Sequence, residues 1–313
     1  MTVKHHTDGQ RLLGYLLVAA GASLWGTLGI VGRVLYGSGL TPGVVVTLRA
    51  VVTAAVLLVT LAVLRPAWLS IRLRDVPYFA AYGLVSVAAY NLLYFLTIQR
   101  ISVAGAAVLL YTAPVFVAVV AYLTLGEPLT RHKLTALILT LVGCALVARA
   151  YKPETFKVQG LGLLTGLGAG FAYGMYGIFG KHGLKRYNPW VLQAYSLLTG
   201  SAALLLLYGR EAAQAVVKSP QLLPIIAYLS LVPTLGAYGL YLTGLQFIES
   251  SHASILATVE LVVAALLGYL VLGEPLNLPQ VAGTVLVLAG AVILHAGSSA
   301  STSQPLPGNK GRK

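Results

Sequence analysis

The chain is built mainly of apolar runs, each about as long as a helix that crosses a bilayer. The hydrocarbon core of a membrane is about 30 Å thick and needs roughly 20 apolar residues per helix. Runs of about that length, bounded by charged residues, proline or glycine, occur ten times. The pattern therefore predicts an all-α polytopic membrane protein with ten transmembrane helices. They are expected over residues 12–32, 42–64, 76–98, 101–124, 134–148, 160–180, 189–208, 223–247, 251–272 and 278–295.

The composition supports this class and excludes others. Of the 313 residues, 21 are Lys or Arg and 8 are Asp or Glu, so that 9% are charged, whereas a soluble domain has about a quarter. Hydrophobic residues make up 58%, and the mean hydropathy is +0.83. An ordinary soluble enzyme, a disordered chain and a nucleic-acid binder of the basic-patch kind are excluded. The single cysteine, Cys144, rules out a disulfide framework, and the scattered histidines disfavour a metal site.

The net charge of +13 arises from basic residues in the short segments between apolar runs, where they indicate topology rather than an acidic partner. With the N-terminus inside, the inner segments hold 13 Lys and Arg, and the outer loops hold seven. Cytoplasmic segments are enriched in these residues. We therefore expect an integral protein of the inner or plasma membrane with both termini in the cytoplasm. The tail over residues 297–313 is rich in Ser, Pro and Gly and is predicted to be disordered.

The two halves of the chain are related by an internal repeat, which predicts five-helix units over residues 12–149 and 159–296. Because each unit holds an odd number of spans, the second lies inverted in the membrane. Inverted repeats are typical of secondary transporters, whose substrate site lies near the midplane between the halves. A duplicated scaffold without transport stays as the alternative. A shift of 147 residues superposes Gly126-Glu127-Pro128-Leu129 on Gly273-Glu274-Pro275-Leu276, Pro42 on Pro189 and Tyr94 on Tyr241, and a shift of 148 superposes Trp25-Gly26 on Tyr173-Gly174.

Several motifs stand out against this repeat: Trp25-Gly26, Arg49, Pro114, the paired Gly-Glu-Pro turns and Glu260. Together they resemble the motifs of the drug/metabolite transporter superfamily, in particular the EamA type with two tandem five-helix units. The resemblance covers about residues 12–295 and implies a ten-helix carrier. It also implies a central cavity lined mainly by helices 1, 3, 4, 6, 8 and 9, with helices 5 and 10 at the periphery. The family commonly has Glu-Pro in the ninth helix, where this chain has Glu260-Leu261 and so lacks a proline to kink it.

Two ionisable residues, Arg49 and Glu260, lie well inside apolar spans, and both come out near the midplane at 1.5 Å per helical residue. A charge at that depth costs about 3 kcal/mol on insertion scales and needs a partner. Glu260 shares a helical face with small residues, which favours a packed or cavity-facing position over a lipid-facing one. It is expected to contact substrate. The alternatives are a proton carrier and a structural pair in which Arg49 is the charge partner.

Aromatic residues gather at similar depths. In the third span, Tyr82, Ser86, Tyr90 and Tyr94 recur every four residues and form one polar face. Interfacial belts explain aromatic residues near helix ends but not these deeper ones. Each one alone could instead be a core residue with a satisfied hydroxyl group. The substrate-binding residues predicted from this pattern are Trp25, Tyr90, Asn91, Tyr94, Tyr111, Tyr173, Tyr176, Tyr238, Tyr241 and Glu260.

The sequence therefore predicts a secondary transporter that exports amino acids or related small metabolites by alternating access. A carrier for lipophilic or quaternary cations is the alternative, because Tyr and Trp faces beside Glu260 suit a cation. A membrane-embedded enzyme ranks third, since no catalytic motif occurs and neither a cofactor nor a metal is indicated. The expected partners are a small-molecule substrate and the lipid bilayer. Proton coupling and the oligomeric state stay open.

Overall fold

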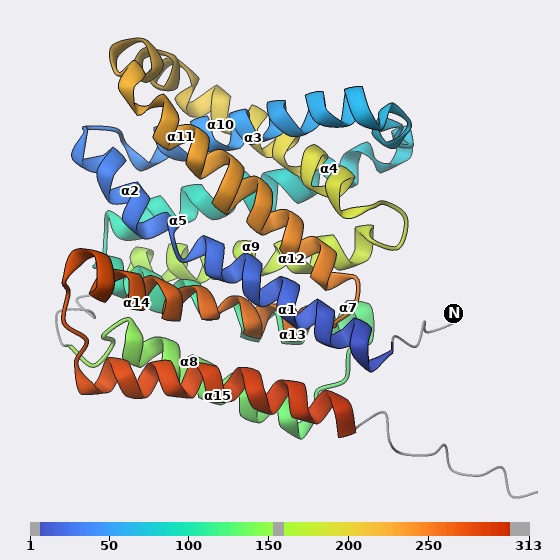
Figure 1. The fold of residues 1–313 in the computed structure, drawn as a ribbon, viewed down its shortest axis with the longest axis vertical. Coiled ribbons are helices and arrows are strands. Elements are labelled where there is room, and N and C mark those ends of the chain that lie inside the picture. Colours follow the sequence, from blue (N-terminus) through green and yellow to red (C-terminus); the bar gives the residue numbers. More distant parts are fainter. Residues whose placement is uncertain (1–6, 153–159, 301–313) are drawn as a thin grey trace, which may run out of the picture.

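The computed structural model describes residues 7–152 and 160–300, with side chains to residue 296, and every regular element in these ranges is a helix (Figure 1). The first half contains α1 (Asp8–Trp25), α2 (Leu28–Gly37), α3 (Pro42–Leu64), η1 (Pro66–Leu69), η2 (Leu73–Asp75), α4 (Val76–Gly83), η3 (Leu84–Ala89), α5 (Tyr90–Ile98), α6 (Val103–Leu110), α7 (Ala113–Leu125) and α8 (Arg131–Val147). The second half contains α9 (Gly160–Gly183), α10 (Pro189–Lys218), η5 (Pro220–Leu222), α11 (Leu223–Ser230), η6 (Leu231–Gly236), α12 (Ala237–Leu245), α13 (Ser250–Ala257), α14 (Val259–Leu272) and α15 (Leu278–Ala300).

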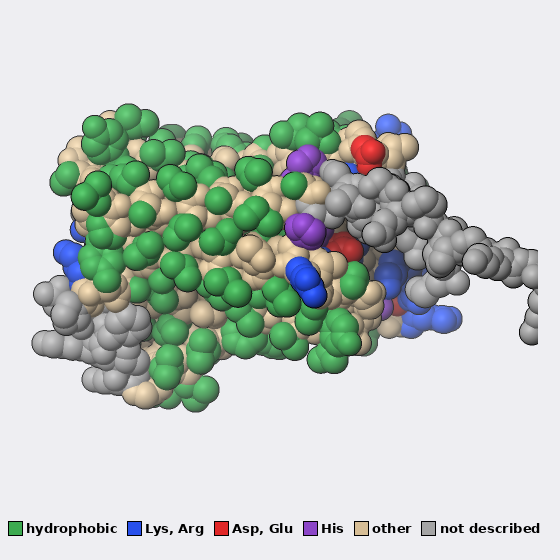
Figure 2. Space-filling view, turned by 90° about the horizontal axis from the view of Figure 1, so that it is seen from below, with side chains coloured by type: hydrophobic (Ala, Val, Ile, Leu, Met, Phe, Trp, Pro, Cys, Tyr) green, Lys and Arg blue, Asp and Glu red, His purple; other side chains and the backbone are tan. Residues whose placement is uncertain are grey.

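These elements form the expected polytopic membrane fold. Nine helical stretches of the described residues are long and apolar enough to cross a membrane, and the remaining expected span is α8, which has 17 residues. The surface carrying α8 and α15 is mostly apolar between ends that carry charged side chains (Figure 2). Exposed Ile138, Val285 and Val292 lie on this surface. Such a band is what contact with lipid acyl chains requires.

Two helices extend beyond the ends expected from the sequence. The seventh span was expected to end at residue 208, but α10 continues to Lys218. The residues after Tyr208 include Ala, Glu, Gln and Lys, which are strong helix formers, so the end of the apolar run does not end the helix. The predicted disordered tail began at residue 297, but α15 reaches Ala300. The rest of that tail lies outside the described residues.

Local sequence signals explain where several spans begin and end. Pro42 and Pro189, which are equivalent in the repeat, occupy the first turns of α3 and α10. The preceding Thr41 and Asn188 cap these helices, and the Asn188 side chain accepts a hydrogen bond from Val191 N at 3.0 Å. At the opposite ends of two other spans, Gly126 and Gly273 follow α7 and α14 with φ of 71° and 68°. This left-handed conformation favours glycine and ends the helix.

The helices nearest the centre are interrupted within the membrane. The third and eighth spans contain π-helical turns, η3 (Leu84–Ala89) and η6 (Leu231–Gly236), at positions that coincide under the 147-residue shift. The fourth span breaks between α6 and α7 before Pro114, and the ninth breaks at Thr258 between α13 and α14. The ninth span therefore breaks without a proline. The Thr258 hydroxyl donates to the Ile255 carbonyl at 2.6 Å and so satisfies one acceptor at the break.

Close helix contacts through glycine assemble the bundle. α8 and α15 pack side by side at one edge (Figure 1), and a Cβ on Gly143 would lie 2.7 Å from the Gly283 carbonyl oxygen. On α9, the four-residue glycine spacing packs against the fourth span, because a Cβ on Gly170 would lie 2.7 Å from the Leu109 carbonyl oxygen. Gly21 brings α1 equally close to the Ala237 carbonyl of α12. Short interhelical distances of this kind replace the hydrophobic driving force that is absent within a membrane.

Candidate functional site

Aromatic side chains from four spans meet at the centre of the bundle. The Trp25 ring at the end of α1 lies 4.8 Å from that of Tyr238 and 5.4 Å from that of Tyr241, both on α12. Tyr176 on α9 continues the cluster, with its ring 4.8 Å from Tyr238. The centres of the Trp25 and Tyr173 rings are 6.5 Å apart. The tilted and edge-to-face geometries are those that aromatic pairs favour, so the rings hold one another in place.

Tyr90 and Tyr94 extend this cluster from the third span. The Tyr90 ring lies 5.3 Å from Tyr173 and 6.4 Å from Tyr94. Tyr82, from the same predicted face, contacts Tyr176 at 5.0 Å. The π-helical turn η3 lies between Tyr82 and Tyr90 and changes the direction of their side chains. The polar face predicted for the third span is therefore not continuous: Tyr82 packs against Tyr176, whereas Tyr90 packs against Tyr173.

A small central cavity lies within the aromatic cluster. Its volume is about 10 Å³, which is room for about one water molecule. The wall is formed by α1, η3, α9, α12 and α13, so both repeats contribute to it. The lining residues are Trp25, Ser86, Tyr173, Gly174, Tyr176, Tyr238, Tyr241, Ser254 and Ala257.

Glu260 lies next to this cavity, behind Tyr173. It occupies the first turn of α14, directly after the helix break, and accepts a hydrogen bond from the Tyr173 hydroxyl at 3.2 Å. A carboxylate is favoured in the first turn of a helix because the free N–H groups and the helix dipole attract negative charge. Among the described residues no ion pair joins Arg49 to Glu260, although Arg49 is half-buried on α3.

Five predicted site residues are not in the cavity wall. Tyr90 and Tyr94 extend the aromatic cluster and Glu260 bonds to Tyr173, whereas the other two, Asn91 and Tyr111, make their contacts elsewhere. Asn91 is buried, and its side-chain amide donates to the Val87 carbonyl of its own span at 2.7 Å. Tyr111 packs in a separate apolar cluster with Cys144, Val262 and Val287. Neither residue is in the cavity wall. Both residues were predicted because of their depth along their spans. Depth alone does not specify which side of a helix meets the cavity.

The structure adds cavity residues that the sequence pattern did not select. Ser254 and Ala257 lie on α13, and Gly174 lies on α9. Ala257 belongs to the stripe of small residues that shares a face with Glu260, and that stripe was the available signal. Ser86 was part of the polar face in the third span but not of the predicted binding set. It lies in η3, which packs against α9 and α10, and it lines the cavity together with residues of α12 and α13.

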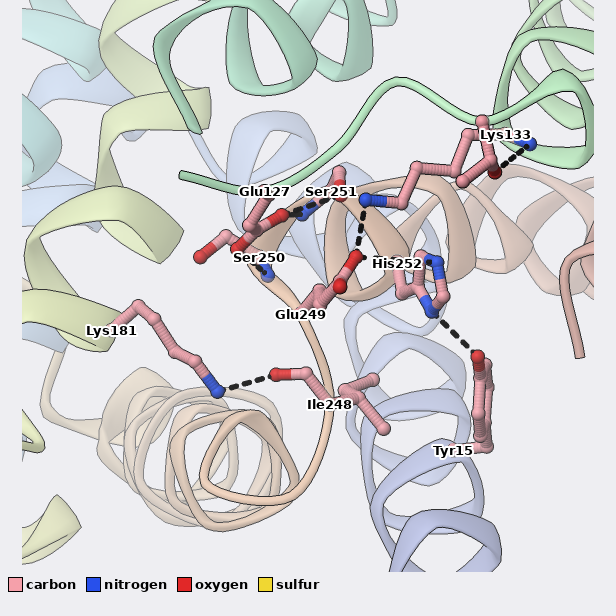
Figure 3. Close-up of polar contacts among 10 residues, drawn as sticks. Tyr15, Glu127, Lys133, Lys181, Ile248, Glu249, Ser250, Ser251 and His252 are labelled. Carbon is pink, nitrogen blue, oxygen red and sulfur yellow. Dashed lines mark hydrogen bonds and ion pairs between the residues drawn. The ribbon is translucent and has the colours of Figure 1, made fainter. Parts of the chain in front are cut away.

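A second group of polar residues joins α1, α8, α9, α12 and α13 and the turn after α7 at one end of the bundle (Figure 3). We call this the proximal end, where α1 begins, and the opposite one the distal end (Figure 1). The buried Glu127, after α7, accepts hydrogen bonds from the N–H groups of Ser250 and Ser251 at 2.6 and 3.0 Å and from the Ser251 hydroxyl at 2.5 Å. Glu127 therefore caps the N-terminus of α13 with its charge.

Three further contacts reinforce this junction. Lys133 of α8 forms an ion pair with Glu249, directly before α13. Tyr15 of α1 is hydrogen-bonded to His252 of α13 at 2.6 Å. Lys181 near the end of α9 donates to the Leu245 and Ile248 carbonyls at 2.7 and 2.6 Å. The basic residues predicted as topology signals are here bonded within the protein, and the proximal end is sealed around the start of α13.

At the distal end, the residues that the structure describes form no equivalent junction. Glu274, which matches Glu127 in the repeat, is about half exposed and pairs with exposed Arg33 at 2.7 Å. The positions equivalent to Ser250 and Ser251 are Val103 and Ala104 at the start of α6, and Val103 is 66% exposed. α7 packs against α13, whereas no comparable packing joins α14 to α6 in the described part. The Gly-Glu-Pro turn thus occurs in both repeats, but its glutamate is buried against a helix start in one repeat and exposed in the other.

Comparison with known proteins gives one consistent result. The model of the EamA-like transporter family matches residues 12–149 and 160–296. An uncharacterized transporter of Archaeoglobus fulgidus is 35% identical over 217 residues, covering 67% of this chain and 75% of the relative. The uncharacterized inner membrane transporter YicL of Salmonella typhimurium is 27% identical and covers 93% of this chain and 97% of its own.

A solved crystal structure shares the fold, with a TM-score of 0.75 over 95% of this chain and 100% of the other, at 16% identity. The family match extends over residues 12–149 and 160–296 and agrees with the motifs and with the ten-helix membrane fold. These findings place the chain in the EamA-like transporter family.

Proposed function

We propose that this transporter exports amino acids or related small metabolites by alternating access through the central cavity. The observation that carries the proposal is an aromatic cavity between inverted repeats with one carboxylate, Glu260, beside it. An ammonium group is attracted both by a carboxylate and by the faces of Trp and Tyr rings. A phosphate-bearing substrate would require several buried basic residues, and Arg49 alone lies at that depth.

The difference between the two ends supports alternating access. In a carrier of two inverted repeats, exchanging their arrangements converts closure at one end into closure at the other. The proximal end is closed around Glu127 and Ser250, whereas the equivalent Glu274 is exposed. On the Lys and Arg distribution, the proximal end faces the cytoplasm of the cell. The described conformation is then closed toward the cytoplasm.

The proposal is tested by exchange of labelled compounds in proteoliposomes that contain the purified protein. The panel contains neutral amino acids, their amines and tetraphenylphosphonium. We expect exchange of amino acids, and a loss of at least about tenfold in Glu260→Gln, because the ammonium loses its counter-charge. Glu211→Gln, at an exposed position on α10, is the matched control. Amino acid exchange that is unaffected in a well-expressed Glu260→Gln protein removes Glu260 from the mechanism.

Efflux of lipophilic cations is the second candidate. It is favoured by the contact between Tyr173 and Glu260, because an aromatic ring and a carboxylate both attract a cation. The same panel separates the two functions. Exchange of tetraphenylphosphonium without exchange of any amino acid would establish cation efflux and overturn the first proposal. Imposed pH gradients of both signs test proton coupling, since a coupled carrier accumulates substrate in response to them.

A further inference from the structure

Three residues of the cavity wall carry a buried polar group without a hydrogen-bond partner. Among the described residues, these groups are Trp25 Nε1, Ser86 Oγ and the Tyr176 hydroxyl. Buried polar groups in proteins nearly always have a partner, because leaving one unpaired is destabilising. Because all three groups can donate and Trp25 Nε1 can only donate, their place in one cavity wall indicates a missing acceptor.

Ser86 differs from comparable hydroxyl groups within the spans. Ser23, Ser230 and Thr243 each donate to the carbonyl four residues earlier, at 2.8, 2.7 and 2.7 Å. This bond is the usual way in which a helix satisfies a hydroxyl group away from water. Ser86 lies in the π-helical turn η3 and makes no such bond. Its hydroxyl group is therefore free to donate into the cavity.

The Trp25 indole is held in its position by its neighbours. Tyr238 and Tyr241 pack against the ring. The next residue, Gly26, fits so closely against α14 that a Cβ on it would lie 2.9 Å from the Glu260 carbonyl oxygen. The indole N–H can act only as a donor. A group bound in the cavity must consequently offer an acceptor to it.

The cavity wall thus holds unpaired donors, and another wall residue, Tyr173, donates a hydrogen bond to the Glu260 carboxylate. We infer that Trp25 Nε1 and Ser86 Oγ form the subsite for the substrate's carboxylate group, and that the ammonium group of the same molecule faces Glu260. This inference rests on the proposed function and narrows its substrate class to zwitterionic α-amino acids. A carboxylate can accept both donors at once, whereas an amine without it leaves both unpaired.

Neutral donors suit such a substrate. The carboxylate of a zwitterion already has its own ammonium as counter-charge, so the site does not require an Arg or Lys to balance it. The side chain of the amino acid would then meet the remaining aromatic wall. Because the closed cavity has room for about one water molecule, the repeats must separate before an amino acid can enter.

The test compares leucine with 3-methylbutylamine, which is leucine without its carboxylate. The variants are Trp25→Phe, which keeps an aromatic ring and removes the N–H, and Ser86→Ala. Their matched controls are Trp68→Phe at an exposed position and Ser23→Ala, whose hydroxyl group bonds within its helix. Half-saturation and maximal rate of exchange are measured in proteoliposomes for both compounds and for leucine amide.

We expect each cavity variant to raise the half-saturation concentration of leucine roughly five- to tenfold and to leave that of the amine unchanged, with a smaller rise for the amide, whose carbonyl oxygen still accepts a hydrogen bond. The controls should change neither. Equal losses for leucine and the amine would show that the two residues serve packing, and an unchanged leucine value would show that they do not bind its carboxylate. Either result overturns the subsite while wild-type leucine exchange upholds the proposed function. Exchange of amines without any amino acid by the wild-type protein overturns both.

Discussion

The capping of α13 by Glu127 predicts that one uncharged substitution opens the proximal end. Glu127→Gln keeps the shape of the side chain but removes the charge and replaces one acceptor oxygen with an NH₂ group. The present carboxylate accepts three hydrogen bonds, from Ser250 N, Ser251 N and Ser251 Oγ. In the variant the NH₂ group faces donors and leaves at least one of them unpaired.

The magnitude follows from these contacts. A hydrogen bond to a charged group contributes about 1.5–3 kcal/mol, and a neutral one about 0.5–1.5 kcal/mol. Losing one bond and the charge assistance of the others gives about 2–4 kcal/mol less stabilisation of the closed junction. The ratio of closed to open forms should fall roughly 30- to 700-fold. The equivalent Glu274→Gln should have an effect near zero, because its ion pair with Arg33 is exposed and solvent-screened.

The assay is a distance measurement between spin labels by pulsed electron paramagnetic resonance. Cysteines replace Leu129 and Gln246, which flank the proximal junction, in a Cys144→Ala background. The repeat equivalents Leu276 and Gln99 provide a matched distal pair. We expect Glu127→Gln to lengthen and broaden the proximal distances and, because alternating access transfers closure to the other end, to shorten the distal ones. An unchanged proximal distribution in a folded variant, or an equal change in Glu274→Gln, would refute the role of Glu127 in closure.

Three other predictions follow from packing, charge and topology. Gly143→Ala places a Cβ against the Gly283 carbonyl and should lower the free energy of unfolding by about 1–3 kcal/mol, seen as a lower thermal midpoint, while Gly209→Ala, which meets only ordinary contacts, should not. Glu260→Gln should stay folded with strongly reduced exchange; if it fails to express and is rescued by also neutralising Arg49, the carboxylate is a structural counter-ion instead. A tag after Gly297 should be unreachable by impermeant reagents outside intact cells, and labelling from outside would reverse the orientation.

Much of the architecture follows from the linear pattern, because a bilayer imposes strong constraints on it. The length of apolar runs identifies the spans, and the 147-residue shift between Gly126-Glu127-Pro128 and Gly273-Glu274-Pro275 identifies the repeat. The high cost of charge at the midplane singled out Glu260, and the structure places it beside the central cavity. The helix interruptions were less predictable, since the ninth span breaks at Thr258 without a proline and η3 contains neither proline nor glycine. Only η6 carries a local signal, Pro233, which removes a helix hydrogen bond.

The composition of the site depends on which sides of the helices meet, and this is a property of packing. Ser86 lies in the cavity wall, while Asn91 bonds within its own span and Tyr111 joins another cluster. Likewise, Glu127 and Glu274 stand in the same Gly-Glu-Pro turn, yet one is buried in a junction and the other is exposed. A nearly symmetric sequence permits closure at either end. Which end closes depends on contacts between helices that are distant in sequence. Those contacts determine whether Glu127 or Glu274 accepts hydrogen bonds from the free N–H groups at the start of a helix.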